Sequence, residues 1–521
     1  MATELLANAQ RRADTLRARY RAAGSWSDQP LDVMRTAAVR HPDLPALITR
    51  GADISFAELD GRVDAAAQAL LDAGVTASTP VIVVAGNDVD SVSAVHATVR
   101  IDAVVLLVPR SAGAAQIADI VARTGARFGV APNWPVGADS LTGECAWIDV
   151  TTHGGRGATG VRRTQRAADE PSFVLFTSGT TSKPKGVIHS LSTLSKASTN
   201  YIAAAGLTDG DRIFLISPLA SVTGVLQALF IGPMLAAPVV LEDRWEPSAT
   251  CELLVTSKAT WYGGPDRLLD RVLDEAVTAG HEMPLRAVYL GGTVLDRRIV
   301  ERVEDDFGII VMRAYGSSEV PVSTSGLRTE PRNVRHADDG VALGDVDVRL
   351  GSVGDPAECC IRGPHTFLGY TDAADDADAF DGEWFRTGDV AELEGRRVRI
   401  VGRLKDIIIR NGLKIPAAEV DEALARIAGV RECAAYSVPD LTTGERLAVA
   451  LVVEPDVAIS LADVARELAS AGLAKYKLPE ELVFWDQPLP LNANGKVERN
   501  KLHACSNGRP RDVADRLNAA P

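Results

Sequence analysis

Short apolar runs alternate with segments of helical periodicity along the early chain, and this alternation limits the fold more than any other feature. Residues 56–73 repeat apolar side chains at helical spacing, and an apolar run follows at 81–84. Further runs of strand length lie at residues 104–108, 173–176, 287–290 and 309–312. Strands that alternate with helices are typical of α/β folds with parallel sheets. We therefore predict an α/β fold with packed, largely parallel sheets.

After about residue 400 the pattern changes to that of a smaller α+β unit. Residues 407–410 and 413–415 flank Asn411-Gly412, a dipeptide that favours a two-residue hairpin turn. A helix and a strand are predicted to follow, at residues 419–427 and 447–453.

The chain has 521 residues, which is too long for one ordinary core. At about 150 residues per domain, its length indicates two to four structural units. We predict a large N-terminal domain over residues 1–402 and a small, mobile α+β C-terminal domain over residues 403–521.

Composition and charge exclude several classes of partner. The net charge of −14 disfavours nucleic acid and anionic membranes, because both select basic surfaces. The six cysteines show no zinc-site spacing, and the N-terminus lacks a signal peptide, so we expect a cytoplasmic protein. Residues 213–241 are apolar but interrupted by proline and glycine, which predicts a buried strand, a loop and a buried helix instead of a membrane span.

A loop rich in hydroxyls, glycine and lysine follows the apolar run at 173–175. Gly179 has no side chain to keep an anion from nearby backbone N–H groups, and Lys185 supplies a positive charge. The next glycine, Gly186, follows a lysine, so the spacing disfavours a Walker-type P-loop. The segment predicts a polyphosphate ligand. Its hydroxyl donors are Thr177, Ser178, Thr180 and Thr181.

Several segments between about residues 30 and 500 resemble, in the same order, the motifs of the adenylate-forming superfamily. That superfamily includes acyl-CoA synthetases, the adenylation domains of peptide synthetases and firefly luciferase. The phosphate loop is the first motif, with Ser182 in place of the usual glycine. The resemblance implies ATP and Mg²⁺ as cofactors and a carboxylic acid as substrate. The further motifs are Gly291-Gly292-Thr293, residues 315–319, residues 384–389, residues 402–406 and residues 490–497.

The resemblance implies a role for each matching residue of the large domain. The ring of Tyr315 would stack on adenine, while Glu319 and Thr180 would hold Mg²⁺ on the triphosphate. Asp389 would accept hydrogen bonds from the ribose hydroxyls, and Arg403 would contact the ribose or a phosphate. The remaining nucleotide contacts would come from Gly291, Gly292, Thr293, Ala314, Gly316 and Ser318.

The implied reaction joins two anions, because a carboxylate attacks the α-phosphate of ATP and forms acyl-AMP and pyrophosphate. Mg²⁺ at Glu319, the phosphate loop with Thr180 and Lys185, and Lys496 of the small domain would offset their repulsion. A thiol would then expel AMP. The hinge between the half-reactions would lie at Lys405, and the hairpin around Gly412 would face the thiol's pantetheine arm.

The acid's pocket would be lined by Val222, Gly224 and Gly316, and by Ser221 at a position where many acyl-CoA synthetases carry an aromatic residue or histidine. Serine there leaves a more open wall, which favours a bulkier or longer acid. No aspartate in residues 217–224 could bind an α-ammonium group, so an amino acid substrate is disfavoured.

Three functions remain open at this stage. The first is a carboxylic acid–CoA ligase, and the second is an enzyme that loads the phosphopantetheine of an acyl carrier protein. Both acceptors present the same thiol, and the absence of an obvious insertion in residues 320–358 favours coenzyme A. The third is an inactive nucleotide-binding homologue, which the convergent set of polar residues disfavours. The sequence does not name the acid, and it fits a monomer or a homodimer.

Overall fold

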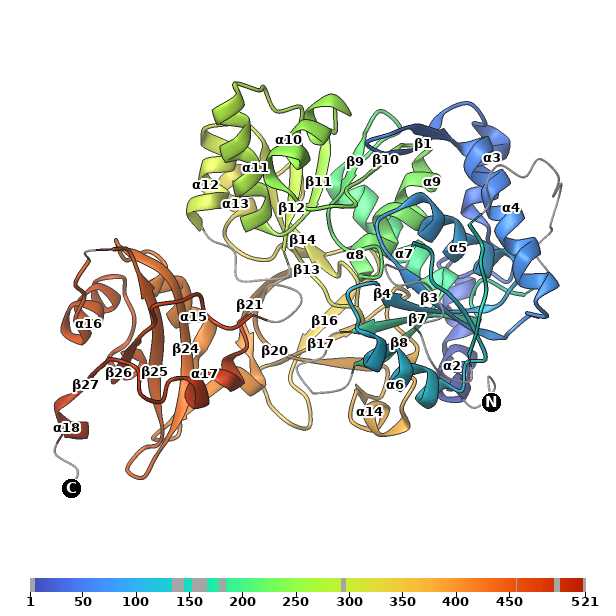
Figure 1. Cartoon of the computed structure of the whole chain (residues 1–521). Coiled ribbons are helices and arrows are strands. Elements are labelled where there is room, and N and C mark those ends of the chain that lie inside the picture. Colours follow the sequence, from blue (N-terminus) through green and yellow to red (C-terminus); the bar gives the residue numbers. More distant parts are fainter. Residues whose placement is uncertain are drawn as a thin grey trace. The chain divides into compact units, whose positions relative to one another are not determined.

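The structure is a computed structural model, and it describes residues 5–133, 145–151, 166–177, 184–291, 297–455, 457–491 and 497–518. Its contacts divide the chain into two compact units (Figure 1). Unit 1 comprises Met1–Val348, Ile361–Phe385 and Gly395–Val398, and unit 2 comprises Arg349–Cys360, Arg386–Glu394 and Arg399–Pro521. The chain therefore enters unit 2 three times. A functional domain division between residues 402 and 403 stays a prediction.

One sheet of unit 1 has the strand order β18, β8, β7, β4, β3, β5, β6. Its strands pair in parallel from β7 to β6, while β8 is antiparallel to both of its neighbours. The central strands are continuous apolar runs buried on both faces, as parallel strands covered by helices usually are. The strands are β3 (Pro80–Ala85), β4 (Val104–Pro109), β5 (Phe128–Val130), β6 (Ala146–Trp147), β7 (Pro171–Thr177), β8 (Lys185–Ser190) and β18 (Gly369–Tyr370).

Several early helices of unit 1 begin at a side chain that binds a free backbone N–H of the first turn. Helix α4 (Phe56–Asp72) opens with a capping box, in which Ser55 and Glu58 each bind the other's backbone N–H. This cap and the apolar stripe behind it explain why the predicted helix at 56–73 forms. The other early helices are α2 (Ala7–Ala22), α3 (Val33–Arg40), α5 (Val89–Arg100) and α6 (Ala114–Thr124).

A buried arginine joins α3, α4 and α5. Arg100 is fully buried, and its guanidinium lies 2.8 Å from the carboxylate of Asp32, 2.7 Å from that of Asp60 and 2.9 Å from that of Asp64. The partly exposed Arg35 also contacts Asp60, at 3.0 Å, and Asp64. Three carboxylates therefore share the one fully buried positive charge of Arg100. The guanidinium of Arg35, which is partly exposed, neutralises part of the remaining negative charge.

A second sheet of unit 1 places β13, β12, β11, β9, β10 and β1 side by side in parallel, with β2 antiparallel at the edge. Beyond β13, the short strands β14 and β15 continue it in antiparallel pairing. The strands are β1 (Pro45–Ile48), β2 (Asp53–Ser55), β9 (Ile213–Leu215), β10 (Val239–Leu241), β11 (Trp261–Gly264), β12 (Ala287–Leu290), β13 (Ile310–Tyr315), β14 (Thr324–Ser325) and β15 (Val341–Ala342).

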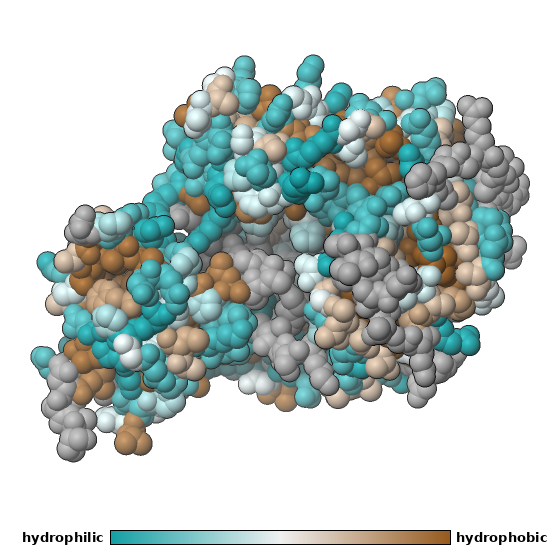
Figure 2. Space-filling view, viewed as in Figure 1, coloured by the Kyte–Doolittle hydropathy of each residue, from teal (hydrophilic) through white to brown (hydrophobic). Residues whose placement is uncertain are grey.

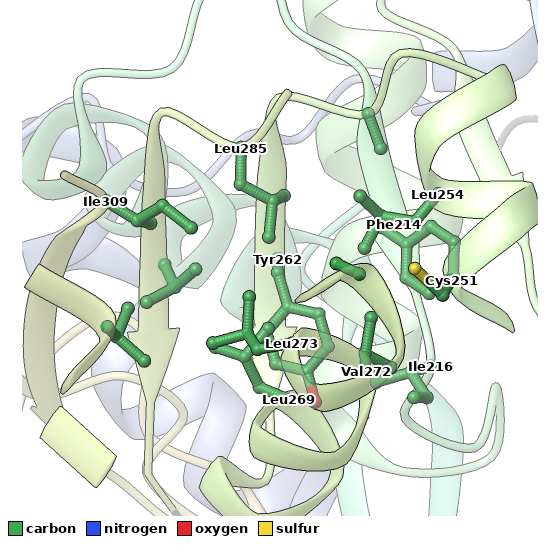
Figure 3. Close-up of a cluster of buried hydrophobic side chains, with 14 of the residues drawn as sticks. Phe214, Ile216, Cys251, Leu254, Tyr262, Leu269, Val272, Leu273, Leu285 and Ile309 are labelled. Carbon is green, nitrogen blue, oxygen red and sulfur yellow. The ribbon is translucent and has the colours of Figure 1, made fainter. Parts of the chain in front are cut away.

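Helices α10 (Pro247–Thr256), α11 (Asp266–Ala279) and α12 (Arg297–Asp305) cover one face of this sheet (Figure 1). Figure 3 shows their core, where Phe214 and Tyr262 of the strands meet Leu269 and Leu273 of α11. Removing such apolar surface from water stabilises the fold by about 25 cal/mol per Å². The outward sides of these helices are mainly hydrophilic (Figure 2), as amphipathic surface helices require.

Two helices contact the opposite face of the second sheet. Helix α7 (Leu191–Ala205) does so through Tyr201, and the π-helix η2 (Val225–Ile231) does so through Gln227. The predicted strand, loop and buried helix within residues 213–241 are therefore confirmed, and the helix is π-helical in its centre. The flanking short helices are α8 (Val222–Gly224) and α9 (Gly232–Leu235). No helix in the described ranges has the length and apolar character that a bilayer crossing requires.

Unit 2 contains a sheet with the order β23, β22, β25, β26, β27, and β24 also pairs with β25. The predicted turn is confirmed, because Asn411 and Gly412 both have positive φ, 51° and 77°, as a type I′ hairpin turn requires. Its elements are β22 (Ile407–Arg410), β23 (Leu413–Pro416), α15 (Ala417–Leu424), β24 (Val430–Asp440), β25 (Gly444–Val453), α16 (Leu461–Ser470), β26 (Glu481–Phe484), α17 (Arg499–Cys505), β27 (Arg511–Val513) and α18 (Asp515–Asn518).

Apart from the 3-10 helix η4 (Lys475–Lys477), the remaining elements lie between residues 332 and 406. They are α13 (Arg332–Arg335), β16 (Asp347–Leu350), β17 (Glu358–Arg362), α14 (Ala373–Ala377), β19 (Phe380–Asp381), β20 (Trp384–Glu394), β21 (Arg397–Arg403) and the 3-10 helix η3 (Leu404–Asp406). Together, the parallel sheets of unit 1 and the smaller α+β arrangement of unit 2 confirm the predicted fold class.

Candidate active site

Two predicted site residues, Gly291 and Tyr315, lie at the carboxyl ends of parallel strands of the second sheet, and two further residues lie at the same edge. Ser217 follows β9, Gly264 ends β11, Gly291 follows β12 and Tyr315 ends β13. In open α/β sheets, ligands bind in the crevice outside this edge. The strand order thus brings together residues that are nearly 100 positions apart in the sequence.

Glu319 is held by two hydroxyl groups. The Tyr370 hydroxyl donates to Oε1 at 2.8 Å, and the Ser317 hydroxyl donates to Oε2 at 2.7 Å. Burial and the charge of Glu319 raise the pKa of Tyr370, so its phenol stays protonated and remains a donor. The Phe367 N–H also donates to the Glu319 carbonyl, at 2.8 Å. Among the described residues each carboxylate oxygen accepts one side-chain hydrogen bond, and a carboxylate oxygen is also a suitable ligand for a hard cation such as Mg²⁺.

Lys185 lies beside the same tyrosine. Its ammonium is 2.8 Å from the Asp375 carboxylate and 5.0 Å from the centre of the Tyr370 ring. The contact arises because β18 pairs with β8, with Tyr370 opposite Val187. Tyr370 therefore contacts both the lysine predicted to bind phosphate and the glutamate predicted to bind metal.

Sequence reasoning missed Tyr370 and Asp375. Neither residue belongs to a motif or a charge pattern that pointed to the site. Only the pairing of a two-residue strand, β18, with β8 places Tyr370 there, and so short a strand has no periodicity to detect.

The two ends of the predicted phosphate loop are side by side. Thr177 pairs with Lys185, and Phe176 pairs with Gly186, across the antiparallel strands β7 and β8. Gly186 also lets Thr371, the residue after β18, pack closely against β8, because a Cβ at Gly186 would lie 2.5 Å from the Thr371 hydroxyl. Four predicted ligands of this loop, Ser178, Gly179, Thr180 and Thr181, lie outside the described residues.

The predicted nucleotide contacts on β12 and β13 are neighbours. A Cβ at Gly291 would lie 3.1 Å from the Ala314 carbonyl oxygen, so the two backbones pass closely. Tyr315 is partly exposed and pairs with Thr324, while Gly316 starts a tight turn in which a Cβ would meet the Val322 nitrogen at 2.4 Å. Gly292, Thr293 and Lys496 lie outside the described residues.

A buried histidine fixes the backbone next to Glu319. His189 of β8 bonds the Ser318 carbonyl through Nε2 at 2.7 Å and the Thr193 hydroxyl through Nδ1 at 3.0 Å. A carbonyl only accepts hydrogen bonds, so Nε2 carries the proton. Burial lowers the pKa of His189 to about 4, although the Ser318 bond opposes this shift. The imidazole is therefore neutral near pH 7.

We expect this histidine to make stability depend on pH. Between about pH 6.5 and pH 4 the unfolded chain binds a proton that the folded chain does not, so the free energy of unfolding falls as pH falls. Replacing His189 by glutamine should reduce that dependence by about 1.4 kcal/mol per pH unit. Urea unfolding from pH 7 to pH 4.5 measures it, and an unchanged slope would contradict the assignment. His96 and His365, whose pKa values burial lowers to about 4 and about 3, add further dependence of the same sign.

In the predicted acid-binding segment, the Ser221 side chain forms hydrogen bonds with the backbone of the same segment. The Ser221 hydroxyl donates to the Pro218 carbonyl at 2.7 Å and accepts from the Gly224 N–H at 3.1 Å. Gly224 is required there, because a Cβ would lie 2.2 Å from the Pro218 oxygen. Ser221 and Val222 are both partly exposed, so this segment can line a pocket.

In unit 2 the structure brings two predicted nucleotide ligands together. Asp389 is buried, and its carboxylate lies 3.2 Å from the Arg403 guanidinium. Its N–H is bound to the Thr387 hydroxyl at 3.0 Å. Lys405 is exposed in η3, and Gly412 is exposed at the hairpin turn.

Two family models match the chain. The model of the AMP-binding enzyme matches residues 34–371, and that of the AMP-binding enzyme C-terminal domain matches residues 419–496.

Similar curated proteins are CoA ligases. One from Mycobacterium tuberculosis, named for a 7a-methyl-1,5-dioxo-octahydro-1H-inden-4-yl propanoyl group, is 29% identical over 88% of this chain and 96% of its own. The salicylyl-CoA synthase / salicylate adenylyltransferase of a Streptomyces species is 28% identical over 95% of this chain and 97% of its own.

A solved structure shares the fold. The o-succinylbenzoate CoA synthetase of Bacillus subtilis, in complex with its acyl-adenylate intermediate, superimposes with a TM-score of 0.80 at 23% identity, covering 91% of this chain and 98% of that one. The first family model spans well over half of the chain. The chain therefore belongs to the AMP-binding enzyme family, and its predicted place in the adenylate-forming superfamily is confirmed.

Proposed function

We propose that the protein is an AMP-forming carboxylic acid–CoA ligase. It activates a carboxylic acid with ATP to acyl-AMP, releases pyrophosphate and transfers the acyl group to coenzyme A. The observation that carries the proposal is the arrangement around Tyr370, whose hydroxyl contacts the carboxylate of Glu319 and whose ring contacts the ammonium of Lys185.

The residues present fit Mg²⁺ bound to a triphosphate. Glu319 offers carboxylate oxygens that two hydroxyls hold in place, and magnesium needs only one or two such ligands besides phosphate and water. When bound, the ion neutralises phosphate charge and so lowers the repulsion between the two anionic reactants.

The remaining chemistry is positioning. Lys185 exchanges its bond with Asp375 for the departing phosphates, and Tyr315 stacks on the base. His189 keeps the backbone of residues 318–319 against β8. Thr180 as a metal ligand and Lys496 as the lysine that bridges carboxylate and phosphate remain predictions, as do the roles of Asp389, Arg403, Lys405 and Gly412.

Coenzyme A is favoured as the acceptor because the similar curated proteins that span nearly the whole chain are CoA ligases. Transfer to the phosphopantetheine of a carrier protein is the alternative, and a cytoplasmic location and a monomeric or dimeric state remain predictions.

The test is exchange of labelled pyrophosphate into ATP with a panel of aromatic, alicyclic and straight-chain acids. We expect exchange with at least one acid, followed by formation of its acyl-CoA, detected by mass spectrometry. Exchange without acyl-CoA formation would favour a carrier-protein acceptor. No exchange with any acid would favour an inactive nucleotide-binding homologue.

A further inference from the structure

A polar and aromatic cluster fills the space between the second sheet of unit 1 and helices α7 and η2. The Tyr201 hydroxyl accepts hydrogen bonds from the Gln227 amide at 2.9 Å and from the Trp261 indole N–H at 3.0 Å. The rings of Tyr201, Trp261 and Tyr289 meet edge to face, with centroids 4.7 to 5.9 Å apart. We call these four residues the Gln227 cluster. It is a rigid block, since each ring packs against the other two.

The cluster leaves no space behind Gly263 of β11. A Cβ at this position would lie 2.1 Å from the Gln227 nitrogen and 2.6 Å from the Tyr201 hydroxyl. The Gln227 amide also contacts the Gly263 carbonyl, at 3.4 Å. The side chain of Gln227 thus occupies the volume that a larger residue at Gly263 would take.

The cluster adjoins the edge of the sheet where the acid is expected to bind. The Ser217 hydroxyl donates to the Gly263 carbonyl at 3.3 Å, and Gly264 is the next residue of β11. Ser217 and Gly264 are partly exposed, whereas Gly263 is buried and Gln227 has no exposed surface. The exposed part of β11 therefore ends at Gly264, next to the buried Gly263 that Gln227 contacts.

Helix geometry places the glutamine there. Gln227 lies in the π-helix η2, in which each N–H bonds five residues back, and such turns often occur at functional sites. Within the described part of the chain, Gln227 Oε1 has no hydrogen-bond partner. An alkyl chain pushed against this amide would leave the oxygen unsatisfied and gain nothing from contact with it.

We infer that Gln227 closes the inner end of the acid's pocket and limits the protein to compact acids, such as short-chain, branched or single-ring carboxylic acids. This inference rests on the proposed function and names its substrate class. The sequence predicts a bulkier or longer acid. The inference keeps the bulkier acid, because the open wall at Ser221 leaves the pocket wide, and excludes the longer one, because Gln227 makes the pocket shallow.

The test is the chain-length profile of pyrophosphate exchange with straight-chain acids from butanoate to hexadecanoate. In the wild type, kcat/KM should fall steeply beyond the length that Gln227 permits. Replacing Gln227 with alanine removes the amide and its methylene, and the preferred acid should become longer by two or three methylene groups. Each methylene newly buried should raise kcat/KM about fourfold, so the ratio of long to short acid should rise at least about tenfold.

The matched control is Gln227→Leu, which keeps most of the volume but removes the hydrogen bonds. Its profile should stay that of the wild type. The ratio between two acids on one enzyme cancels losses of folded protein, so a merely structural role would not change it. A wild type that uses hexadecanoate as well as butanoate, or the same shift in both variants, would overturn the inference. If the wild type exchanges pyrophosphate with no acid at all, the proposed function fails as well.

Discussion

Replacing Glu319 by glutamine is expected to lower the rate of ATP–pyrophosphate exchange by about 100-fold or more, the usual effect of removing a group that stabilises charge in the transition state. Glutamine keeps the size of the side chain. Its amide oxygen can accept from one of the two hydroxyls, those of Tyr370 and Ser317, and its NH₂ group can donate to the oxygen of the other, so the main change is the loss of the negative charge. The Mg²⁺ concentration needed for half-maximal exchange should rise in parallel, and titration of the variant with MgCl₂ measures it.

The matched control is Tyr370→Phe, which removes one hydrogen bond to Glu319 and leaves the carboxylate. A hydrogen bond to a charged group contributes about 1.5–3 kcal/mol, so exchange should fall more than tenfold while remaining above that of Glu319→Gln. A Glu319→Gln variant with an unchanged Mg²⁺ requirement would contradict the metal assignment, even if its overall rate were lower.

Replacing Arg100 by methionine is expected to cost about 3–5 kcal/mol of stability, because it leaves buried carboxylates without their main partner. Asp32, Asp60 and Asp64 all lie within 3 Å of the Arg100 guanidinium, which is fully buried. The shift of the urea unfolding midpoint at pH 7 measures the loss. Part of the stability should return as pH falls, because protonation removes the uncompensated charges.

Arg35→Met is the control for this experiment. Arg35 contacts two of the same carboxylates, but about a third of its side chain is exposed to water, which screens its charge. Its removal should cost about 1 kcal/mol or less. Equal losses in the two variants would show that burial of Arg100 does not determine the stability of the cluster.

The fold could be predicted largely because its strands are continuous apolar runs. Residues 104–108 and 287–290 are such runs, and the structure forms β4 and β12 there. The Asn411-Gly412 turn was predictable from local chemistry, since both residues tolerate positive φ. The π-helical turn at Gln227 was not predictable, because an apolar run has the same composition in an α-helix and in a π-helix.

The candidate site also contains residues that the sequence could predict and residues that it could not. Glu319, Lys185, Asp389 and Arg403 stand in segments that resemble motifs of the adenylate-forming superfamily. Tyr370 of β18, Asp375 of α14 and His189 of β8 act through contacts with residues far away in the sequence, and such long-range contacts leave no local pattern in the sequence. Motifs can therefore identify groups that bind a ligand, while the groups that orient them require the structure.

The three entries of the chain into unit 2 have a consequence for protein engineering. A fragment that begins at Arg399 would leave behind Arg349–Cys360 and Arg386–Glu394, and with them residues such as Asp389 and the Asp355 partner of Lys414. A graft of the small domain from another member of the family, joined at a single point after residue 402, would pair that domain with foreign versions of these two segments. Successful chimeras should therefore exchange all three segments together.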